Sequence, residues 1–476
     1  MENHMVADQD VDDDHDQEEL LNLSLAIVTD HDQKRRSKKK RRVVFSTSSA
    51  ADQEEGKVFK LLQTREQMLK KILIDQTRKQ HDDRYGGLRL IRLLLLTATA
   101  VDENNADSVM RNLTELYQAV SLTGDSVQRV VAYFSDGLAA RLLTRKSPFY
   151  DMILKDPTSE EQFLSFTYLY RASPYYQFAH FTANQAIFEA FNKEQDDNNR
   201  ALHVIDLDVS YGFQWPSLIQ SLSEKATSAN KIYLRITGFG RSIEELQETE
   251  TRLVSFSKGF HNLVFEFRGL LTSPSSPFQT PRSKRKRSET VAVNLVFHLN
   301  TLDSSMKISD TLRSVRSLHP SIVTLVEHES CSRSTPRSFL SLFMESLQYF
   351  AAMFDSLEDC LPLESAERLS IEKNHLGKEI KSMLNYGDDH HHEKIETWKG
   401  RMESHGFSGV EVSSRSMMQA KLLLKMRTHY CPLQFGGENN YINGGGFRVF
   451  GRDEGKAISL GWQGRCLLTA SAWRCV

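Results

Sequence analysis

The fold is decided by the stretch that begins Ala201-Leu202-His203-Val204-Ile205-Asp206-Leu207-Asp208 and continues, three residues later, as Gly212-Phe213-Gln214-Trp215-Pro216-Ser217-Leu218-Ile219-Gln220. Its first half is a short apolar run of the kind that is buried on both faces of a sheet. Its second half has a glycine-bearing loop followed by apolar residues at helical spacing. The stretch therefore predicts a strand, a loop and a helix, which together open an α/β fold.

Strands and helices continue to alternate towards the end of the chain. Short β-branched or aromatic runs predict further strands at residues 231–237, 263–267, 291–297 and 322–327. Helical spacing predicts helices at residues 215–224, 243–257, 338–356, 366–384, 393–404 and 417–426. Two last strands are expected near residues 409–413 and 457–470. Strands that alternate with helices form βαβ units, so we expect a mostly parallel sheet.

The chain before residue 200 has a helical apolar period instead. Apolar positions share one helical face at two places, first Leu88, Ile91, Leu95 and Thr99, and then Val127, Val130, Val131, Phe134 and Leu138. We expect a helical cap here. Several short helices cannot all pack their apolar faces against one small sheet, so part of this apolar surface should remain for a partner. Leu95, Val127 and Phe134 are therefore candidate partner-binding residues. The alternative is that they complete the chain's own core.

The overall charge is close to neutral. The 476 residues carry 60 basic and 62 acidic side chains, which gives a formal net charge of −2. Without a positive field to hold nucleic acid, any DNA contact must be local or made through a partner. The five cysteines are an odd number without CxxC pairs, which favours free thiols in a reducing compartment. The longest apolar run, residues 93–101, is far shorter than the roughly 20 residues that a bilayer requires, so we expect no membrane span.

Residues 1–56 offer little apolar surface, and we expect them to form a disordered tail. Between Asp8 and Glu19 there are eight carboxylates and no Lys or Arg. Such a run fits either a solvated segment or an acidic activation segment.

Three leucines follow the acidic run. Leu21, Leu23 and Leu25 form an LxLxL pattern that resembles the short motif by which plant repressors recruit co-repressors. An extended peptide can place alternate leucines in pockets on such a partner. So short a motif also arises by chance, and that alternative stays open.

A basic cluster in the tail has the composition of a nuclear import signal. Eight cations occur within nine residues: Lys34, Arg35, Arg36, Lys38, Lys39, Lys40, Arg41 and Arg42. Charges this dense keep the segment extended and accessible, which import requires, while a solvated charge run is the alternative. Residues 273–290 carry a second basic group and, like the Gly/Asn-rich residues 432–456, are expected to be a surface insertion.

Three blocks of the sequence resemble the hallmark motifs of the plant GRAS family of transcriptional regulators. His203-Val204-Ile205-Asp206 is similar to the family's VHIID strand, residues 347–358 resemble a further block, and Ser471-Ala472-Trp473 resembles the terminal SAW motif. The blocks occur in the family's order. Residues 176–187 and 234–237 look closest to the nodulation signalling pathway 2 type, sometimes called scarecrow-like.

This resemblance implies the fold class, the domains and the function. It implies a GRAS domain over residues 57–476, with a helical cap and leucine-rich region at 57–200 and an α/β core at 201–476. The core sheet would be Rossmann-like, similar to that of S-adenosylmethionine-dependent methyltransferases. The resemblance further implies a nuclear regulator that is not an enzyme, acts with other GRAS proteins or transcription factors, and reaches DNA indirectly.

A methyltransferase-like enzyme on the same fold is the alternative. A Rossmann cofactor site needs small residues, typically a GxG spacing, where the backbone approaches the ligand. The loop at residues 208–213 has only Gly212 and two bulky aromatics, Tyr211 and Phe213, so we expect no cofactor. Residues 238–240 lack the third glycine of a phosphate-binding loop and are expected to form a turn.

Other chemistry-bearing residues have structural interpretations. Asp206 and Asp208 are two residues apart at the end of a strand, so their side chains should point to opposite faces and not act as a pair. The histidines at residues 390–392 lie in a polar linker that we expect to be solvated, with no metal bound. Trp473 and the other family-motif residues are expected to be core anchors before they are binding residues.

Overall fold

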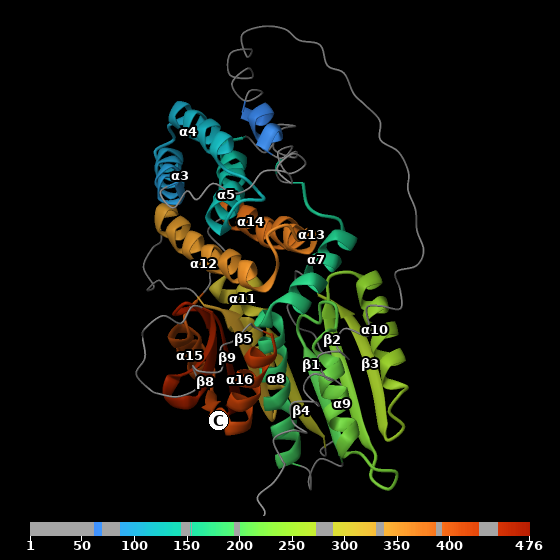
Figure 1. The fold of residues 1–476 in the computed structure, drawn as a ribbon. Helices are drawn as coiled ribbons and strands as arrows, with labels where there is room; N and C mark the ends of the chain where they lie inside the picture. The colour runs from blue at the N-terminus through green and yellow to red at the C-terminus, as the bar shows by residue number, and fades with distance from the viewer. Residues whose placement is uncertain are drawn as a thin grey trace, which may run out of the picture. The chain divides into compact units, whose positions relative to one another are not determined.

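The structure, a computed structural model, describes residues 61–68, 86–143, 153, 155–194, 200–272, 289–329, 338–386, 393–427 and 446–476. They form two compact units (Figure 1). The sheet unit contains helix α8 (Pro174–Lys193), the described residues from 200 to 329, and those from 393 to the end. The sheet unit also contains Glu194, and the helical unit contains the described residues up to Ser173 and those from 338 to 386.

One sheet with nine strands organises the described part of the sheet unit. The strands are β1 (Ala201–Asp206), β2 (Ile232–Gly240), β3 (Leu263–Leu271), β4 (Thr290–Val296), β5 (Ile322–His328), β6 (Phe407–Val410), β7 (Phe447–Arg452), β8 (Ala457–Trp462) and β9 (Arg465–Cys475). Their order is β3-β2-β1-β4-β5-β9-β8-β7, and β6 also pairs with β9. The first five in this order are parallel, whereas β9, β8, β7 and β6 add antiparallel pairs.

The predicted α/β fold with a mostly parallel, Rossmann-like sheet is confirmed. The single strand expected at residues 457–470 is instead a hairpin of β8 and β9. Gln463 and Gly464 both have positive φ, 47° and 85°, as a two-residue hairpin turn of the primed type requires. β7 lies where a Gly/Asn-rich loop was expected to run to residue 456, which was wrong, because Phe447–Arg452 pairs residue by residue with β8.

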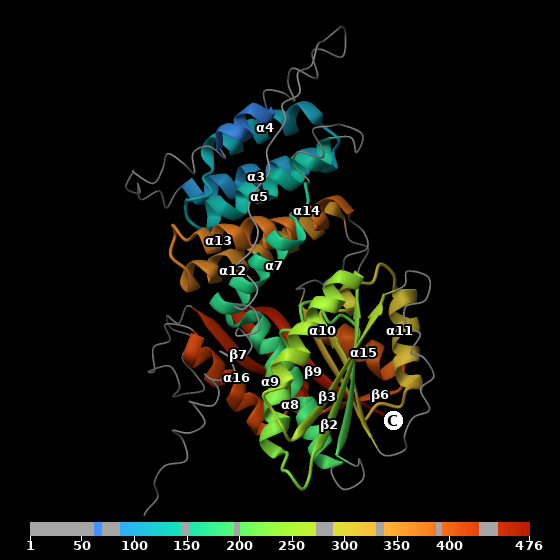
Figure 2. The ribbon, with the colours of Figure 1, turned by 90° about the vertical axis from the view of Figure 1, so that its right-hand side faces the viewer.

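Helices cover both faces of the sheet. The apolar residues of α8, α9 (Trp215–Lys225) and α10 (Ile243–Ser257) lie in one core cluster with β1 and β2. Those of α11 (Ser305–Ser317) and α15 (Ile395–Ser404) lie in another, with β4 and β5. Figure 2 shows α9 and α11 on opposite sides of the strands. α16 (Ser414–Arg427) packs against α8. α11 was not among the helices expected from the sequence.

The helical unit consists of helices wrapped around an aromatic core. They are α3 (Gly86–Asp102), α4 (Ala106–Ala119), α5 (Ser126–Leu142), α7 (Ser159–Ala172), α12 (Phe339–Cys360), α13 (Ala366–Ile371) and α14 (Gly377–Tyr386), together with a helical segment at residues 61–68. Asp125 caps α5 by accepting a hydrogen bond from the Gln128 amide. A π-helical turn, Glu372–Leu376, divides the helix that was expected to be continuous at residues 366–384.

A buried ion pair holds the π-helical turn. Arg129 of α5 donates to Glu372 at 2.9 Å, and both side chains are fully buried. Arg368 donates to the same carboxylate at 3.2 Å. Burial raises the pKa of Glu372, while the two guanidinium groups lower it. Arg129, which is distant in the sequence from the other two side chains, therefore fixes α5 against α13 and the turn.

The two units do not follow the division expected at residue 200. α8 precedes that residue but packs on β4, β5 and β9 of the sheet. α12, α13 and α14 follow it but pack against α5 and α7 in the helical unit. Among the described helices, none has the length and apolar character needed to cross a membrane.

Candidate functional sites

The carboxyl end of β1 is held by buried hydrogen bonds. Asp206, at that end, accepts hydrogen bonds from Trp215 Nε1 at 3.1 Å and Asn294 Nδ2 at 2.9 Å. Asn294 Oδ1 in turn accepts from Gln214 at 3.1 Å and from Thr324 at 2.8 Å. Burial raises the pKa of Asp206 to about 7. Asp206 thus ties β1 to β4, and through Asn294 to β5 and the start of α9, which is the structural role expected of it.

In a Rossmann-like fold, an adenosine cofactor would bind at this edge, where the glycines should leave bare backbone. Gly212 has φ of +76°, but a Cβ placed on it would lie 2.7 Å from Thr249 Cγ2. A Cβ on Gly238 would meet Val209 at 2.9 Å, and one on Gly240 would meet Leu246 at 2.8 Å. The chain's own side chains therefore cover all three glycines, so these residues do not fit the cofactor. Residues 238–240 end β2 and are not the expected turn.

A second polar group lies at the neighbouring strand ends. Glu327 of β5 accepts hydrogen bonds from the backbone amides of Leu299 at 2.6 Å and Asn300 at 3.2 Å. Burial raises the pKa of Glu327 to about 8, and the nearby Asp208 adds to this. Burial, together with the nearby charge of Arg241, lowers the pKa of His298 to about 4. Neither Glu327 Oε2 nor His298 Nε2 has a hydrogen-bond partner in the described part of the chain. Neither residue was among the candidates expected from the sequence.

Asp208 lies close enough to Asp206 for its charge to add to the burial that raises the pKa of Asp206. It accepts a hydrogen bond from the Ser210 amide at 3.2 Å and faces Arg241 at 3.5 Å. Across the described ranges, no three or more His, Cys, Asp or Glu side chains are grouped so that they could hold a metal ion. The edge therefore offers titratable groups but no catalytic constellation that we can build from the described residues.

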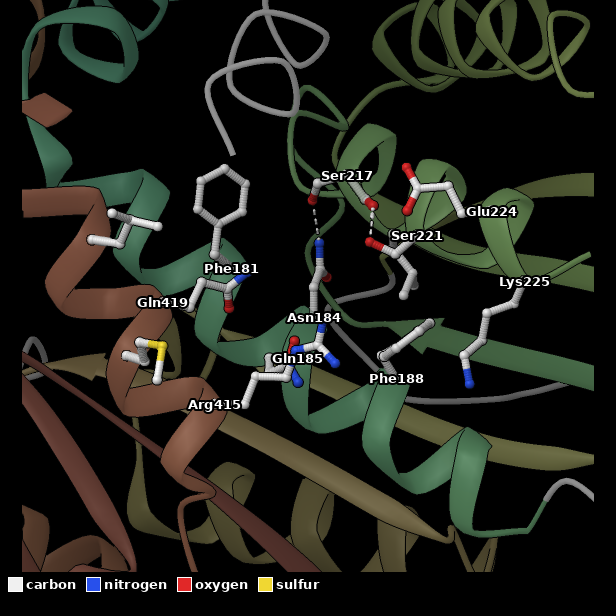
Figure 3. Close-up of a pocket in the computed structure, with 13 residues that line it drawn as sticks. Phe181, Asn184, Gln185, Phe188, Ser217, Ser221, Glu224, Lys225, Arg415 and Gln419 are labelled. Atoms are coloured by element: carbon white, nitrogen blue, oxygen red, sulfur yellow. Dashed lines mark hydrogen bonds between the residues drawn. The ribbon is translucent and has the colours of Figure 1, made fainter. Parts of the chain in front are cut away.

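A polar pocket of about 240 Å³ lies where α8, α9 and α16 meet (Figure 3). Its polar side chains are largely engaged with one another. Asn184 donates to Ser217 Oγ at 2.8 Å, and Ser221 donates to the Ser217 carbonyl at 2.9 Å. Lys225 lies 5.2 Å from the centre of the Phe188 ring. The pocket is small, and these contacts engage several of its polar groups, although the buried Gln419 Oε1 has no hydrogen-bond partner among the described residues.

The three candidate partner-binding residues differ in how deeply they are buried in the helical unit. Phe134 is fully buried and packs edge-on against Phe343, with ring centres 5.3 Å apart, so this residue belongs to the core. Leu95 and Val127 are half-buried. More exposed than either are two leucines of α3, Leu88 at 76% and Leu96 at 52%.

The family-motif residues lie on β1 and β9 of the sheet. Val204 and Ile205 are buried on the two sides of β1. His203 shares a 2.9 Å hydrogen bond with Thr237 on β2. Trp473 is 2% exposed, and its indole donates to Ser471 at 2.9 Å. Ala472 lies on β9 opposite Thr324 of β5.

Several candidate sites fall outside the described residues. In the tail these are Leu21, Leu23 and Leu25 and the basic cluster Lys34–Arg42, and later in the chain they are the basic insertion at residues 282–287 and the histidines at 390–392. Their predictions remain predictions.

Comparison with known proteins gives one family. A model of the GRAS domain family matches residues 90–474. Protein SCARECROW of Arabidopsis thaliana is 34% identical over 405 residues, which are 84% of this chain and 57% of that protein. Protein SCARECROW of Pisum sativum is 34% identical over 393 residues, 82% of this chain and 44% of that protein. The chain thus spans about half the length of these curated relatives.

A shorter relative and a solved structure match over nearly their whole length. Scarecrow-like protein 23 of Arabidopsis thaliana is 33% identical over 401 residues, 83% of this chain and 91% of that protein. The crystal structure of SCL7 in Oryza sativa is 29% identical, with a TM-score of 0.61, and the match covers 81% of this chain and 99% of that chain. The resemblance identified from the VHIID-like and SAW motifs and the scarecrow-like assignment are both confirmed.

Proposed function

Because the chain belongs to the GRAS domain family and is scarecrow-like, we propose that it is a nuclear regulator of transcription in plant development. It acts by forming complexes with other GRAS proteins or transcription factors. The observation that carries the proposal is an exposed apolar row on α3 of the helical unit.

This row, which we call the α3 ridge, consists of Leu88, Arg92, Leu95 and Leu96. With 3.6 residues per turn, the four lie within about 100° of one another around the helix. Leu88 and Leu96 are largely exposed, and Leu95 is half-buried. Exposed leucines grouped beside an arginine resemble the apolar anchors and basic rim of protein interfaces. We therefore keep Leu95 in the proposed partner surface, add Leu88 and Leu96, and exclude Phe134.

Glutamate substitutions on α3 test the ridge. Leu88→Glu and Leu96→Glu should leave the circular dichroism spectrum unchanged and weaken capture of a GRAS partner, because each leucine loses about 1.5–3 kcal/mol of burial in the complex. Leu94→Glu, at a fully buried position of the same helix, should unfold the unit. Met306→Glu, at an apolar side chain 72% exposed on α11, is the matched control. Full capture by both ridge variants would refute the proposed surface.

Nuclear entry is assigned to the basic cluster. Changing Lys38, Lys39, Lys40, Arg41 and Arg42 to Ala in a fluorescent fusion should shift the protein to the cytoplasm, because it removes five of the eight cations. Unchanged nuclear fluorescence would point to residues 282–287 or to carriage by a partner.

The leucine motif is assigned to a co-repressor. A triple change of Leu21, Leu23 and Leu25 to Ala should abolish a weak peptide contact, since each leucine contributes about 1.5–3 kcal/mol when buried. A reporter gene should then lose repression. Activation that depends on the carboxylates of residues 8–19 and ignores the leucines would overturn this assignment.

DNA is reached through a partner. The balanced charge of the chain supports this, because phosphate contacts need clustered cations. Mobility-shift assays with the full chain should show a DNA complex only when the partner is present. A complex formed by the chain alone, weakening steeply as salt rises, would mean direct binding.

An S-adenosylmethionine-dependent methyltransferase is not favoured, because side chains cover Gly212, Gly238 and Gly240. Isothermal titration of the full chain with S-adenosylmethionine should therefore release no heat of binding. A saturating isotherm would reopen the enzyme alternative.

A further inference from the structure

A cavity of about 440 Å³ lies in the sheet unit, between α8, the strands β5 and β9, and the segment that joins β6 to α16. We call it the β5–β9 cavity. Figure 1 shows α8 beside β5 and β9, which it contacts. The volume is within the range of pockets that bind small molecules.

Small side chains on both sides create this space. The lining alanines are Ala183, Ala186 and Ala190 on α8 and Ala470 and Ala472 on β9. The α8 alanines recur three and four residues apart, so they share one helical face. Residues 470 and 472 alternate along a strand, so they share one face of the sheet. Two facing surfaces whose side chains end at Cβ leave a hollow unless the backbones move together.

The hydroxyl groups in the lining are turned to partners in the chain. Thr324 donates to Asn294 Oδ1 at 2.8 Å, and Thr182 donates to the Phe178 carbonyl at 2.6 Å. Ser413 donates to Glu189 at 2.6 Å. Their apolar atoms are left for the cavity. A bound molecule would therefore need a mostly apolar body.

The lining carboxylates on α8 are also engaged. Glu194 accepts hydrogen bonds from Thr290 and Ser321, both at 2.9 Å. Glu189 accepts from Gln185 at 2.7 Å as well as from Ser413. These acids are stabilised as acceptors by groups of the chain, so they are not available to recognise a cationic ligand.

The lining also contains exposed charged side chains. Lys193, at the end of α8, and Arg474, on β9, are both exposed and line the cavity. Within the described residues neither forms an ion pair. Glu411 is the one exposed acid in the lining. The lining holds three carboxylates against these two cations, but Glu189 and Glu194 already accept two hydrogen bonds each from the chain. The two cations are therefore the groups left to bind an anionic head group, and a guanidinium matches a carboxylate with two parallel hydrogen bonds.

We propose that the β5–β9 cavity binds a small amphipathic acid, with its apolar body against the alanines and its carboxylate held by Lys193 and Arg474. The site goes beyond the proposed function, because it would make the regulator respond to a small molecule. It lies in the sheet unit, whereas the α3 ridge lies in the helical unit, so each can fail without the other.

Isothermal titration of the full chain with octanoic acid, and in parallel with 1-octanol, tests the proposal. The acid should bind at least tenfold more tightly than the alcohol. Lys193→Gln combined with Arg474→Gln should remove that preference and leave the alcohol unchanged. Arg313→Gln, at an exposed cation on α11, is the matched control and should keep the preference.

Filling the cavity provides the second arm. Ala472→Leu and, separately, Ala186→Leu should each weaken binding of both probes at least tenfold, because the new side chain occupies the space. Both positions are half-buried, so a larger side chain can prevent folding. Two independent variants are used because one of them can then still be measured if the other does not fold. Ala106→Leu, at an exposed alanine of the helical unit, is the control. Equal affinity in wild type and in folded cavity variants, or a preference for the acid that survives the loss of both cations, would overturn the proposal.

Discussion

Replacing Glu327 with Gln should make the protein less sensitive to rising pH. The glutamine carbonyl can still accept from the backbone amides of Leu299 and Asn300, which lie 2.6 Å and 3.2 Å from Glu327 Oε1. The variant therefore removes a titratable group while keeping its two hydrogen bonds. Any difference from wild type that changes with pH then reports the ionisation of Glu327.

The sign follows from the raised pKa. Burial moves the pKa of Glu327 from 4.5 to about 8, so the folded state keeps a proton that the unfolded state releases. The stability contributed by the protonated group is fully present below pH 4.5 and is lost as the pH rises towards 8. Between about pH 5.5 and about pH 7, linkage gives a loss of about 2 kcal/mol of unfolding free energy from this group.

Wild type alone would not reveal this loss. Burial lowers the pKa values of His203 and His298 to about 4. As the pH rises, these two histidines lose their protons in the unfolded chain, and this increases the unfolding free energy over part of the same range. The quantity to measure is the unfolding free energy of Glu327→Gln minus that of wild type, from urea denaturation at each pH. It should rise by about 2 kcal/mol from about pH 5.5 to about pH 7.

The control is Glu266→Gln, which removes an exposed carboxylate from β3. Its difference from wild type should stay nearly constant over that range. A Glu327→Gln difference that is equally constant would mean that Glu327 ionises normally, and the burial argument for this edge of the sheet would be wrong.

Three further changes test the packing, each by urea denaturation. Trp473→Ala should cost about 3–5 kcal/mol, because the ring is 2% exposed; a cost below about 1 kcal/mol would place the ring outside the core. Arg129→Ala should cost about 3–5 kcal/mol, since Glu372 stays buried with only Arg368 as its ionic partner; an unchanged midpoint would mean that the pair is dispensable. Gly212→Ala should cost about 1–3 kcal/mol, because φ is +76° and the new Cβ would meet Thr249; no loss would show that this loop relaxes freely.

The parallel half of the sheet was predictable from the sequence because strands buried on both faces are continuous apolar runs. β1 and β4 are of this kind, and the observed bounds of β4 differ from the expected 291–297 by one residue at each end. β7 was missed because its pattern, Phe447–Arg452, follows a Gly/Asn-rich stretch that favours a loop, and its partner β8 supplies the pairing energy.

The candidate sites were harder to predict, because periodicity shows that a helix has an apolar face but not which neighbours cover it. On α5 the apolar face that includes Phe134 is covered by α12, which follows some 200 residues later in the chain. On α3, Leu88 and Leu96 stay exposed although they look equally apolar. The burial of Glu327 could not be predicted either, since it depends on the backbone amides of a loop that follows another strand.

The position of β9 in the sheet has a consequence for how the protein is made. β9 lies between β5 and β8 and also pairs with β6, yet it follows all of them in the chain. During synthesis, one edge of β5 therefore has no paired strand until more than 130 further residues have been made. An unpaired edge of this kind invites pairing with other chains. A message that stops before Ser471-Ala472-Trp473 would thus yield a chain that chaperones and proteases recognise as unfinished, so the motif can be required in cells without touching any partner.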